Sequence, residues 1–269
     1  MTVVAALLVP GSPLPYVQPA NPPWGALAAA LQAAGTALTA AAPETLIVYS
    51  TQWLAVLDQL WLTRPHMHGV HVDDNWHEYG DLPYDIRIDT ELTAAIIAAT
   101  PALGIRAKGV NYDGFPLDTG TIVATHFLNH AGRPLAVTSN NLYHDWETTA
   151  AIGRGAVAAA AGLGRRVAVI GVGGLSGSFY RDTIDSKDDR IANASDDAWN
   201  QRMLALAAAG QFDEFLALCP EYAQAAKVDM GFKHCAFIMG GIGGRFRNAT
   251  VHGYGPVYGA GAAVIEFHL

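Results

Sequence analysis

The sequence predicts an α/β fold, in which one domain has a central mixed β-sheet with helices on both faces. Short apolar and β-branched runs alternate with longer segments of helical pattern, and this alternation is typical of layered α/β proteins. Residues 166–171 (RVAVIG) are the clearest central strand because apolar and β-branched side chains run together there. No repeat of roughly 20–50 residues and no long polar linker is visible. Residues 1–269 are therefore expected to form one domain.

The first elements follow from local sequence. Residues 3–9 (VVAALLV) and 45–49 (TLIVY) predict strands, since apolar and β-branched side chains run without interruption. Between them, the proline-rich residues 10–23 predict a loop, and the alanine-rich residues 24–42 predict a helix. Residues 64–85 contain many His and Asp side chains and are expected to form a loop.

Strands and helices continue to alternate along the rest of the chain. Helices are expected where small and apolar residues recur at helical spacing. These segments are residues 90–100, 120–129, 146–161, 197–209, 212–218 and 222–242. Further strands are expected at residues 105–110, 134–138 and 262–267. The polar residues 181–197 predict an irregular connection.

The composition excludes several classes of protein. A hydrophobic share of 51% with only 15% charged residues excludes a disordered chain. The net charge of -8 argues against a nucleic-acid partner, which would require clustered cations. Two cysteines, Cys219 and Cys235, cannot form a disulfide framework, so a reducing compartment such as the cytoplasm is expected. The apolar run 3–9 stops at Pro10, and no segment predicts a signal sequence or a membrane span.

A glycine-rich segment, residues 171–177 (GVGGLSG), follows the clearest strand. A dinucleotide fingerprint requires a third glycine where Ser176 stands. A nucleophile elbow around Ser176 requires a glycine where Ser178 stands. The segment is therefore interpreted as a tight turn in which glycines relieve positive φ angles.

A cluster of histidines, His66, His68 and His71, lies in the predicted loop. An H-x-H pair can bind zinc when further ligands complete the set. Val70 stands where a known metallohydrolase pattern has an aspartate. A metal site at these three histidines is one hypothesis, and solvated or hydrogen-bonded imidazoles are the other.

Several strings spread over nearly the whole chain point to a known family. They are LLVPGSPLP, IVYSTQWL, NYDGFPLDTGTI, SNNLYH, VGGLSG, VDMGFKH and YGPVYGAGAAVIEF. With them the chain resembles the class III extradiol ring-cleaving dioxygenases of the protocatechuate 4,5-dioxygenase type. Within that family, it is most similar to a non-catalytic subunit of the aminophenol-cleaving enzymes.

The resemblance implies a site that has lost its chemistry. Family members hold Fe(II) with two histidines and a glutamate, and another histidine acts as acid and base. The chain has Gly11 and Gln52 at the two histidine ligand positions and Gly177 at the acid/base position. Lys227 aligns with the glutamate, and Phe232 is the alternative. None of these side chains suits ferrous iron, so no catalytic or metal-binding residue is expected in this chain.

The function implied by the resemblance is that of a structural subunit. A homologous catalytic β subunit, expected in an α2β2 heterotetramer, would carry Fe(II) and cleave 2-aminophenol or a substituted aminophenol with O₂. Neither nucleic acid nor membrane is expected as a partner. Two alternatives stay open: the degenerate pocket binds a small regulatory molecule, or the chain is a metalloenzyme that uses His66, His68 and His71.

Overall fold

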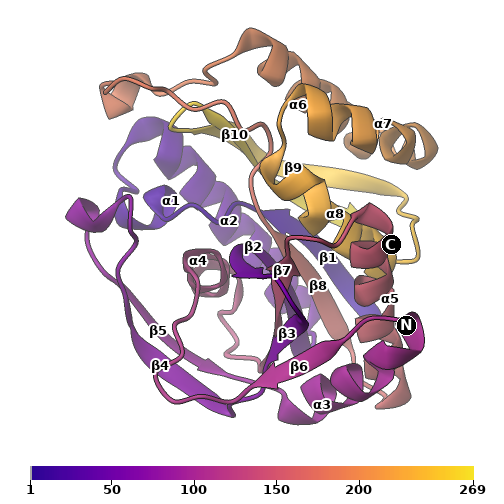
Figure 1. Ribbon diagram of the computed structural model, residues 1–269. Coiled ribbons are helices and arrows are strands. Elements are labelled where there is room, and N and C mark those ends of the chain that lie inside the picture. The colour runs from indigo at the N-terminus through magenta and orange to yellow at the C-terminus, as the bar shows by residue number, and fades with distance from the viewer. Residues whose placement is uncertain (1) are drawn as a thin grey trace.

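An eight-stranded mixed sheet runs through the centre of the molecule (Figure 1). The computed structural model describes residues 2–269. The strands of the sheet are β1 (Val3–Val9), β2 (Thr45–Ala55), β3 (Gln59–Leu62), β6 (Ala107–Val110), β7 (Leu135–Asn141), β8 (Val167–Val172), β9 (Asn248–Val257) and β10 (Ala260–His268). Their order across the sheet is β6-β3-β7-β2-β8-β1-β10-β9.

The four central strands, β7, β2, β8 and β1, are parallel to one another. β10 pairs antiparallel with β1, and β9 with β10, so one side of the sheet is antiparallel. Parallel strands are covered on both faces, which explains their nearly continuous apolar sequences. In β1, for example, Ala6 and Leu8 face one core, whereas Leu7 and Val9 face the other. The predicted α/β fold with a mixed central sheet is confirmed.

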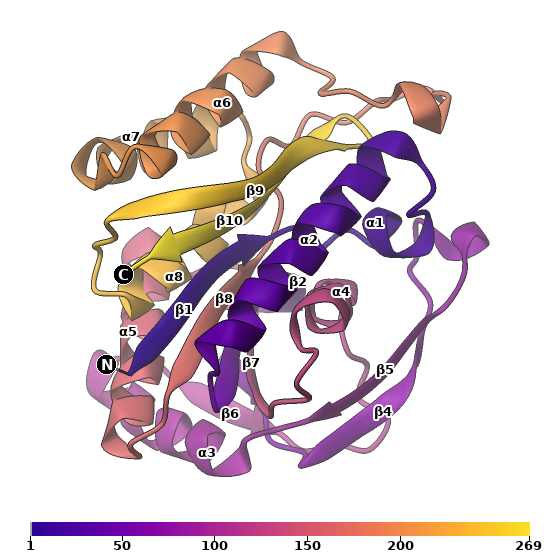
Figure 2. The same cartoon turned by 180° about the vertical axis from the view of Figure 1, so that it is seen from behind.

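Helices cover both faces of the sheet, as Figures 1 and 2 show. The first face carries α3 (Thr90–Ala99), α5 (Trp146–Gly162), α6 (Ala194–Ala208), α7 (Phe212–Ala225) and α8 (Lys233–Gly241). The second face carries α2 (Pro22–Ala41), α4 (Thr119–Leu128) and a hairpin of β4 (His66–His71) and β5 (Leu82–Arg87), and the short α1 (Leu14–Val17) precedes α2. Within residues 2–269, no helix combines the length and the apolar character that crossing a membrane requires.

Five of these helices begin at a capping side chain, and four of them share one hydrogen-bond pattern. The backbone N–H three residues further on donates to Asn21 in α2, Asp89 in α3, Asp118 in α4 and Asp145 in α5. Each contact satisfies one of the N–H groups that a helix start leaves without a partner. These caps place the helix starts within two residues of the predicted ones.

Glycines let α8 approach α5 very closely. A Cβ added at Gly153 of α5 would collide with the carbonyl oxygen of Phe237, and one added at Gly240 of α8 would collide with that of Ala150. Since only glycine lacks this atom, the two helices pack backbone against backbone. This packing fixes the start of α8 above the central strands, where the family site is expected.

Three predictions of local structure differ from the structure, and the first is the loop at residues 10–23, which contains the short helix α1. Residues 64–85 are not a loop, because β4 and β5 form a hairpin whose Met67 and Ile86 face the core while His66 and His68 stand on the other face. The strand was not recognised because histidines occupy its solvent-facing positions, so the segment appears mostly polar. Residues 222–242 are not one helix, because α7 ends at Ala225 and α8 begins at Lys233. The short β3 and the edge strand β9 were not predicted.

Asp189 anchors the irregular segment before α6 to the rest of the fold. Its buried carboxylate accepts hydrogen bonds from the Trp24 indole at 2.8 Å and from the backbone N–H groups of Tyr258 and Gly259 at 2.6 and 2.9 Å. We expect Asp189→Ala to lower the free energy of unfolding by about 3 kcal/mol, because three buried donors lose their acceptor. Urea denaturation measures this. Asp188→Ala, at an exposed neighbour, should change stability little, and equal effects of both substitutions would contradict the assignment.

Candidate functional site

The carboxyl ends of the central parallel strands meet at one edge of the sheet. Gly11 follows β1, Gln52 lies near the end of β2, and Gly173 follows β8. In α/β sheets, ligands bind at this edge. The family site is therefore expected at this edge.

Gly11 and Gln52 lie next to each other at this edge. The Gln52 side-chain amide donates a hydrogen bond to the Gly11 carbonyl oxygen at 3.2 Å. A Cβ added at Gly11 would lie 3.1 Å from Gln52 Nε2 and 3.2 Å from both Gly120 Cα and Val172 Cγ1. The first turn of α4 thus packs tightly over Gly11, and the space for a side chain there is small.

Gly177 lies against the backbone of Lys227. Its N–H donates to the Ala226 carbonyl at 3.0 Å, and a Cβ added at Gly177 would collide with the Lys227 carbonyl oxygen. Lys227 itself is exposed and has a φ of +49°. The structure therefore brings Lys227 and Gly177 together through their backbones, not through the ammonium group.

Phe232, the other residue aligned with the glutamate, is buried in the core. Its ring lies 5.2 Å from that of Tyr222 and belongs to the apolar cluster of the first face. Met230 and Phe232 have φ angles of +45° and +64°, in the left-handed region that non-glycine residues rarely adopt. This backbone conformation breaks the predicted helix 222–242 and turns the chain into α8.

Asp229 is a carboxylate at this edge that the sequence analysis missed. Its Oδ2 accepts hydrogen bonds from the Thr51 hydroxyl at 2.7 Å and from the Gly174 N–H at 3.0 Å. The Thr51 carbonyl in turn accepts from the Asn140 amide at 3.2 Å, and Asn140 accepts from the Tyr49 hydroxyl at 2.8 Å. Polar groups at the ends of β2 and β7 are thus satisfied by one another.

Lys233 is the lysine that reaches the ends of the strands. It lies in the first turn of α8, is almost fully buried, and its Nζ donates to the Asn141 carbonyl at 2.8 Å, at the end of β7. Burial lowers the pKa of Lys233, and the nearby Asp145 carboxylate opposes this shift. No pattern in the sequence separates Lys233 from Lys227, because only the break before α8 places the two lysines differently.

His234 is fully buried beside Lys233, and neither of its ring nitrogens has a hydrogen-bond partner within residues 2–269. A Cβ added at Gly173 would lie 2.7 Å from His234 Nδ1. Burial lowers the pKa of His234 to about 4, and the Asp229 carboxylate opposes the shift. The ring is therefore neutral at pH 7.

The glycines of residues 171–177 allow another backbone segment to pack closely against them, and they do not form a left-handed turn. None of Gly171, Gly173, Gly174 and Gly177 has a positive φ, so the interpretation as left-handed turn positions is wrong. A Cβ at Gly171 would collide with the His234 carbonyl, just as one at Gly177 would collide with that of Lys227. The segment remains free of side chains because the 227–234 backbone lies directly on it.

The three clustered histidines do not converge. His66 and His68 stand on one face of β4, with ring centroids 5.1 Å apart, and His66 Nε2 lies 2.8 Å from Asp85 Oδ1. His71 is on the other face, where its Nε2 lies 2.9 Å from the Thr119 hydroxyl. Among the residues that the structure describes, no three or more His, Cys, Asp and Glu side chains form a group that could hold a metal ion.

Nearly all of the chain matches a known protein family. The family described as "Catalytic LigB subunit of aromatic ring-opening dioxygenase" matches residues 6–265. The chain belongs to this family. The resemblance to the extradiol dioxygenases is therefore confirmed.

Individual relatives of this dioxygenase family agree. The 2-aminophenol 1,6-dioxygenase alpha subunit of a Pseudomonas species is 46% identical over 271 residues, with 100% of both chains covered. The beta subunit named for the same enzyme, also from Pseudomonas, is 25% identical over 91% of this chain and 85% of its own. The 3,4-dihydroxyphenylacetate 2,3-dioxygenase of Escherichia coli is 26% identical over 80% of this chain and 79% of its own.

A solved structure shares the fold. An uncharacterised protein of Escherichia coli K12 superimposes with a TM-score of 0.64 over 98% of this chain and 99% of its own, at 11% identity. At that identity the likeness concerns the fold alone.

The dioxygenase family implies Fe(II), and the residues at the aligned positions do not fit it. Gly11 has no side chain, and the Gln52 amide nitrogen is a donor engaged by the Gly11 carbonyl. Lys227 presents its backbone, and a protonated ammonium has no lone pair to offer. Ferrous sites of this type require imidazole and carboxylate ligands.

Substitution of Gly177 tests its close contact with the backbone of Lys227. We expect Gly177→Ala to lower the free energy of unfolding by about 2 kcal/mol, because its Cβ meets a backbone carbonyl that cannot rotate away. Gly174→Ala is a matched control, since the nearest atoms there lie 3.6 Å away. Denaturant titration compares them. Equal stability of the two variants would contradict the close approach of Lys227.

The buried His234 predicts a loss of stability in mild acid. The unfolded chain binds a proton at this histidine below about pH 6.5, whereas the folded chain does so only below about pH 4. Protonation therefore favours unfolding as the pH falls between these values, by about 3 kcal/mol in total. Unfolding free energies measured across this range should decline less steeply in His234→Leu than in the wild type. Parallel pH profiles would exclude this role.

Proposed function

We propose that this chain is the non-catalytic, structural subunit of a heteromeric extradiol dioxygenase. A homologous partner subunit would carry Fe(II) and open the ring of 2-aminophenol or a substituted aminophenol with O₂. The relatives support this proposal, because one is named as an alpha subunit and another, more distant one as the beta subunit of the same enzyme. Two homologous chains in one enzyme allow one of them to lose its chemistry.

The hydrogen bond between Gln52 and Gly11 carries the proposal. These residues occupy the positions at which the family has its histidine ligands, and they bond to each other through an amide and a backbone carbonyl. Both groups are poor ligands for ferrous iron, and the bond uses the amide as a donor. Two ligand positions therefore offer no imidazole.

Steric closure supports the same proposal. The first turn of α4 leaves little room at Gly11, and the Lys227 carbonyl leaves none at Gly177. An active site that had lost only its ligands would keep its space. In this chain a backbone carbonyl takes the space of a side chain at Gly177, and neighbouring atoms 3.1 to 3.2 Å away would have to shift to admit one at Gly11.

The role left for the chain is assembly. A partner that binds only the folded catalytic subunit stabilises it by mass action. We propose that the complex is an α2β2 heterotetramer in the cytoplasm. The low share of charged residues, 15%, is compatible with a large apolar interface.

The test compares this chain, the homologous partner and their complex. We expect the chain alone to show no ring cleavage of 2-aminophenol and no stoichiometric iron after reconstitution with Fe(II), because its ligand positions hold no suitable donors. The complex should contain iron and cleave the substrate. Iron analysis and absorbance spectroscopy measure both properties.

Two substitutions assign the iron to one subunit. Gln52→Leu in this chain should leave the iron content and the turnover of the complex unchanged within twofold. Replacing the iron ligands of the partner should abolish both. Turnover by this chain alone, or loss of iron on Gln52→Leu, would overturn the proposal.

A further inference from the structure

An exposed apolar patch lies at the carboxyl edge of the sheet, where β2 and β7 end. Along the last residues of β2, Trp53 and Ala55 are buried, whereas Leu54 and Val56 are exposed. Single apolar side chains at a surface are ordinary, but a contiguous group of them indicates a binding surface. The apolar patch consists of the exposed side chains Leu54, Val56, Leu57, Leu103, Leu142 and Tyr143.

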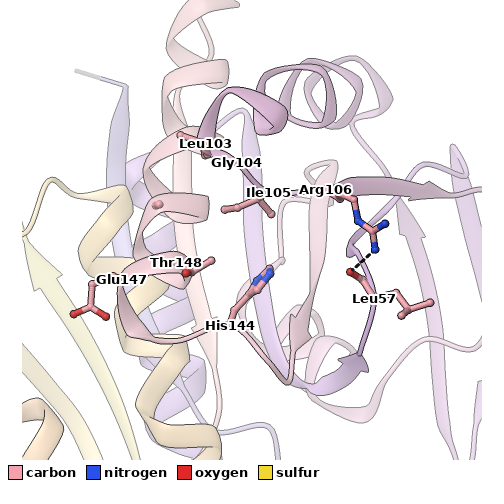
Figure 3. Close-up of a pocket in the computed structure, with 9 residues that line it drawn as sticks. Leu57, Leu103, Gly104, Ile105, Arg106, His144, Glu147 and Thr148 are labelled. Carbon is pink, nitrogen blue, oxygen red and sulfur yellow. Dashed lines mark hydrogen bonds between the residues drawn. The ribbon is translucent and has the colours of Figure 1, made fainter.

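Three segments of the chain bring these side chains together. The Leu142 N–H donates at 2.9 Å to the carbonyl of the residue before Val56, so these two side chains follow neighbouring strands side by side. Leu57 and Leu103 line one hollow together with His144, which directly follows the tyrosine of the patch (Figure 3). The ends of β2 and β7 and the connection from α3 to β6 therefore form one surface.

The apolar patch is large enough for the centre of a dimer interface. Leu57 and Tyr143 are 75% and 82% exposed. All six side chains together present roughly 500 Å² of apolar surface, since a fully exposed aliphatic side chain presents about 120 Å² and an aromatic one about 200 Å². A standard interface buries about 800 Å² on each partner, of which roughly 60% is apolar. The patch thus supplies the apolar share of one side.

Charged side chains border the apolar patch without entering it. Residues 54–57 and 142–144 contain no Asp, Glu, Lys or Arg. Arg106, paired with Asp58 at 3.1 Å, lies on one side of the hollow, and Glu147 lies on the other (Figure 3). An uncharged centre inside a polar rim is typical of protein interfaces. A rim with both signs of charge can face its own copy, because unlike charges can lie opposite each other.

The position of the apolar patch indicates which partner can cover it. A two-fold contact uses the same patch on both subunits. A catalytic homologue has to admit its substrate at the carboxyl edge of the sheet, so it has to keep that surface open. In this chain Gln52 and Gly11 bond to each other at the edge, and the proposed role requires no path for a substrate. Two copies of this chain can therefore cover the edge, whereas two catalytic chains cannot.

We propose that the apolar patch joins two copies of this chain about a two-fold axis. Leu57 and Tyr143 of each copy lose their contact with water there. The inference rests on the proposed function, because it names the contact that unites two heterodimers in an α2β2 complex. The catalytic subunit binds elsewhere on the chain.

Sedimentation equilibrium of the full-length chain tests the contact. We expect a dimer at about 10 µM, a concentration at which a standard-size interface is occupied. The double variant Leu57→Ser/Tyr143→Ser should dissociate at least tenfold more readily, because each substitution occurs twice in a two-fold contact. The matched control is Tyr112→Ser, since Tyr112 is 71% exposed and follows β6 toward the other edge of the sheet. A monomeric wild type, or equal dissociation of both variants, would overturn the proposal.

The complex with the catalytic subunit separates this proposal from the proposed function. The double variant should convert the α2β2 complex to αβ, with iron content and turnover per catalytic subunit unchanged within twofold. A tetramer that persists, or a variant chain that no longer binds the catalytic subunit, would overturn the assignment of the patch. Iron in this chain, or turnover by it alone, would overturn the proposed function without changing these masses.

Hydrogen exchange of the wild-type chain gives a test that does not depend on how the variants fold. The backbone amides of residues 54–57 and 142–144 should exchange severalfold more slowly at a concentration where the chain is dimeric than where it is monomeric. The amides of the hairpin of β4 and β5, on the other face of the sheet, should not change. Exchange at the patch that does not depend on dimer formation would overturn the proposal.

Discussion

The burial of four parallel strands from both faces is the constraint on which the rest of the molecule depends. β1 and β8 are apolar on both sides, and most buried polar residues of β2 and β7 lie in the second half of each strand, toward the same edge of the sheet. Polar groups that are buried at that edge require hydrogen-bond partners. The hydrogen bond from Gln52 to Gly11 and the contact of Thr51 with Asp229 do so with protein atoms.

A sheet edge whose polar groups hydrogen-bond to one another differs from an active site. In an active site, some polar groups await a substrate or a metal, and space is kept for it. Here Asp229 bonds to Thr51 and Gly174, Lys233 bonds to Asn141, and glycines let the backbone close over the strand ends. His234 is the exception, because both of its nitrogens lack partners within residues 2–269. The closed edge is in keeping with the proposed role as a non-catalytic subunit.

The sequence predicted the layered fold because its strands are long apolar runs and its helices contain small and apolar residues that recur at helical spacing. It did not predict the β4–β5 hairpin, where exposed histidines masked the alternation, or the break before α8, which depends on left-handed backbone at Met230 and Phe232. The resemblance led to Gly11 and Gln52. It could not lead to Asp229 or Lys233, since their place at the strand ends follows from that break.

In the proposed structural role, the chain would have no need for an open, strained site but would still need its fold. A catalytic chain balances stability against exposed, unsatisfied groups at its site. A chain that only supports a partner is free to fill its own site with backbone contacts and to gain stability from them. Under this proposal, the close approach of residues 227–234 to Gly171 and Gly177 would be such a contact. A non-catalytic subunit would therefore differ from its catalytic homologue mainly at the strand ends, where backbone fills the site. The central sheet would stay the same.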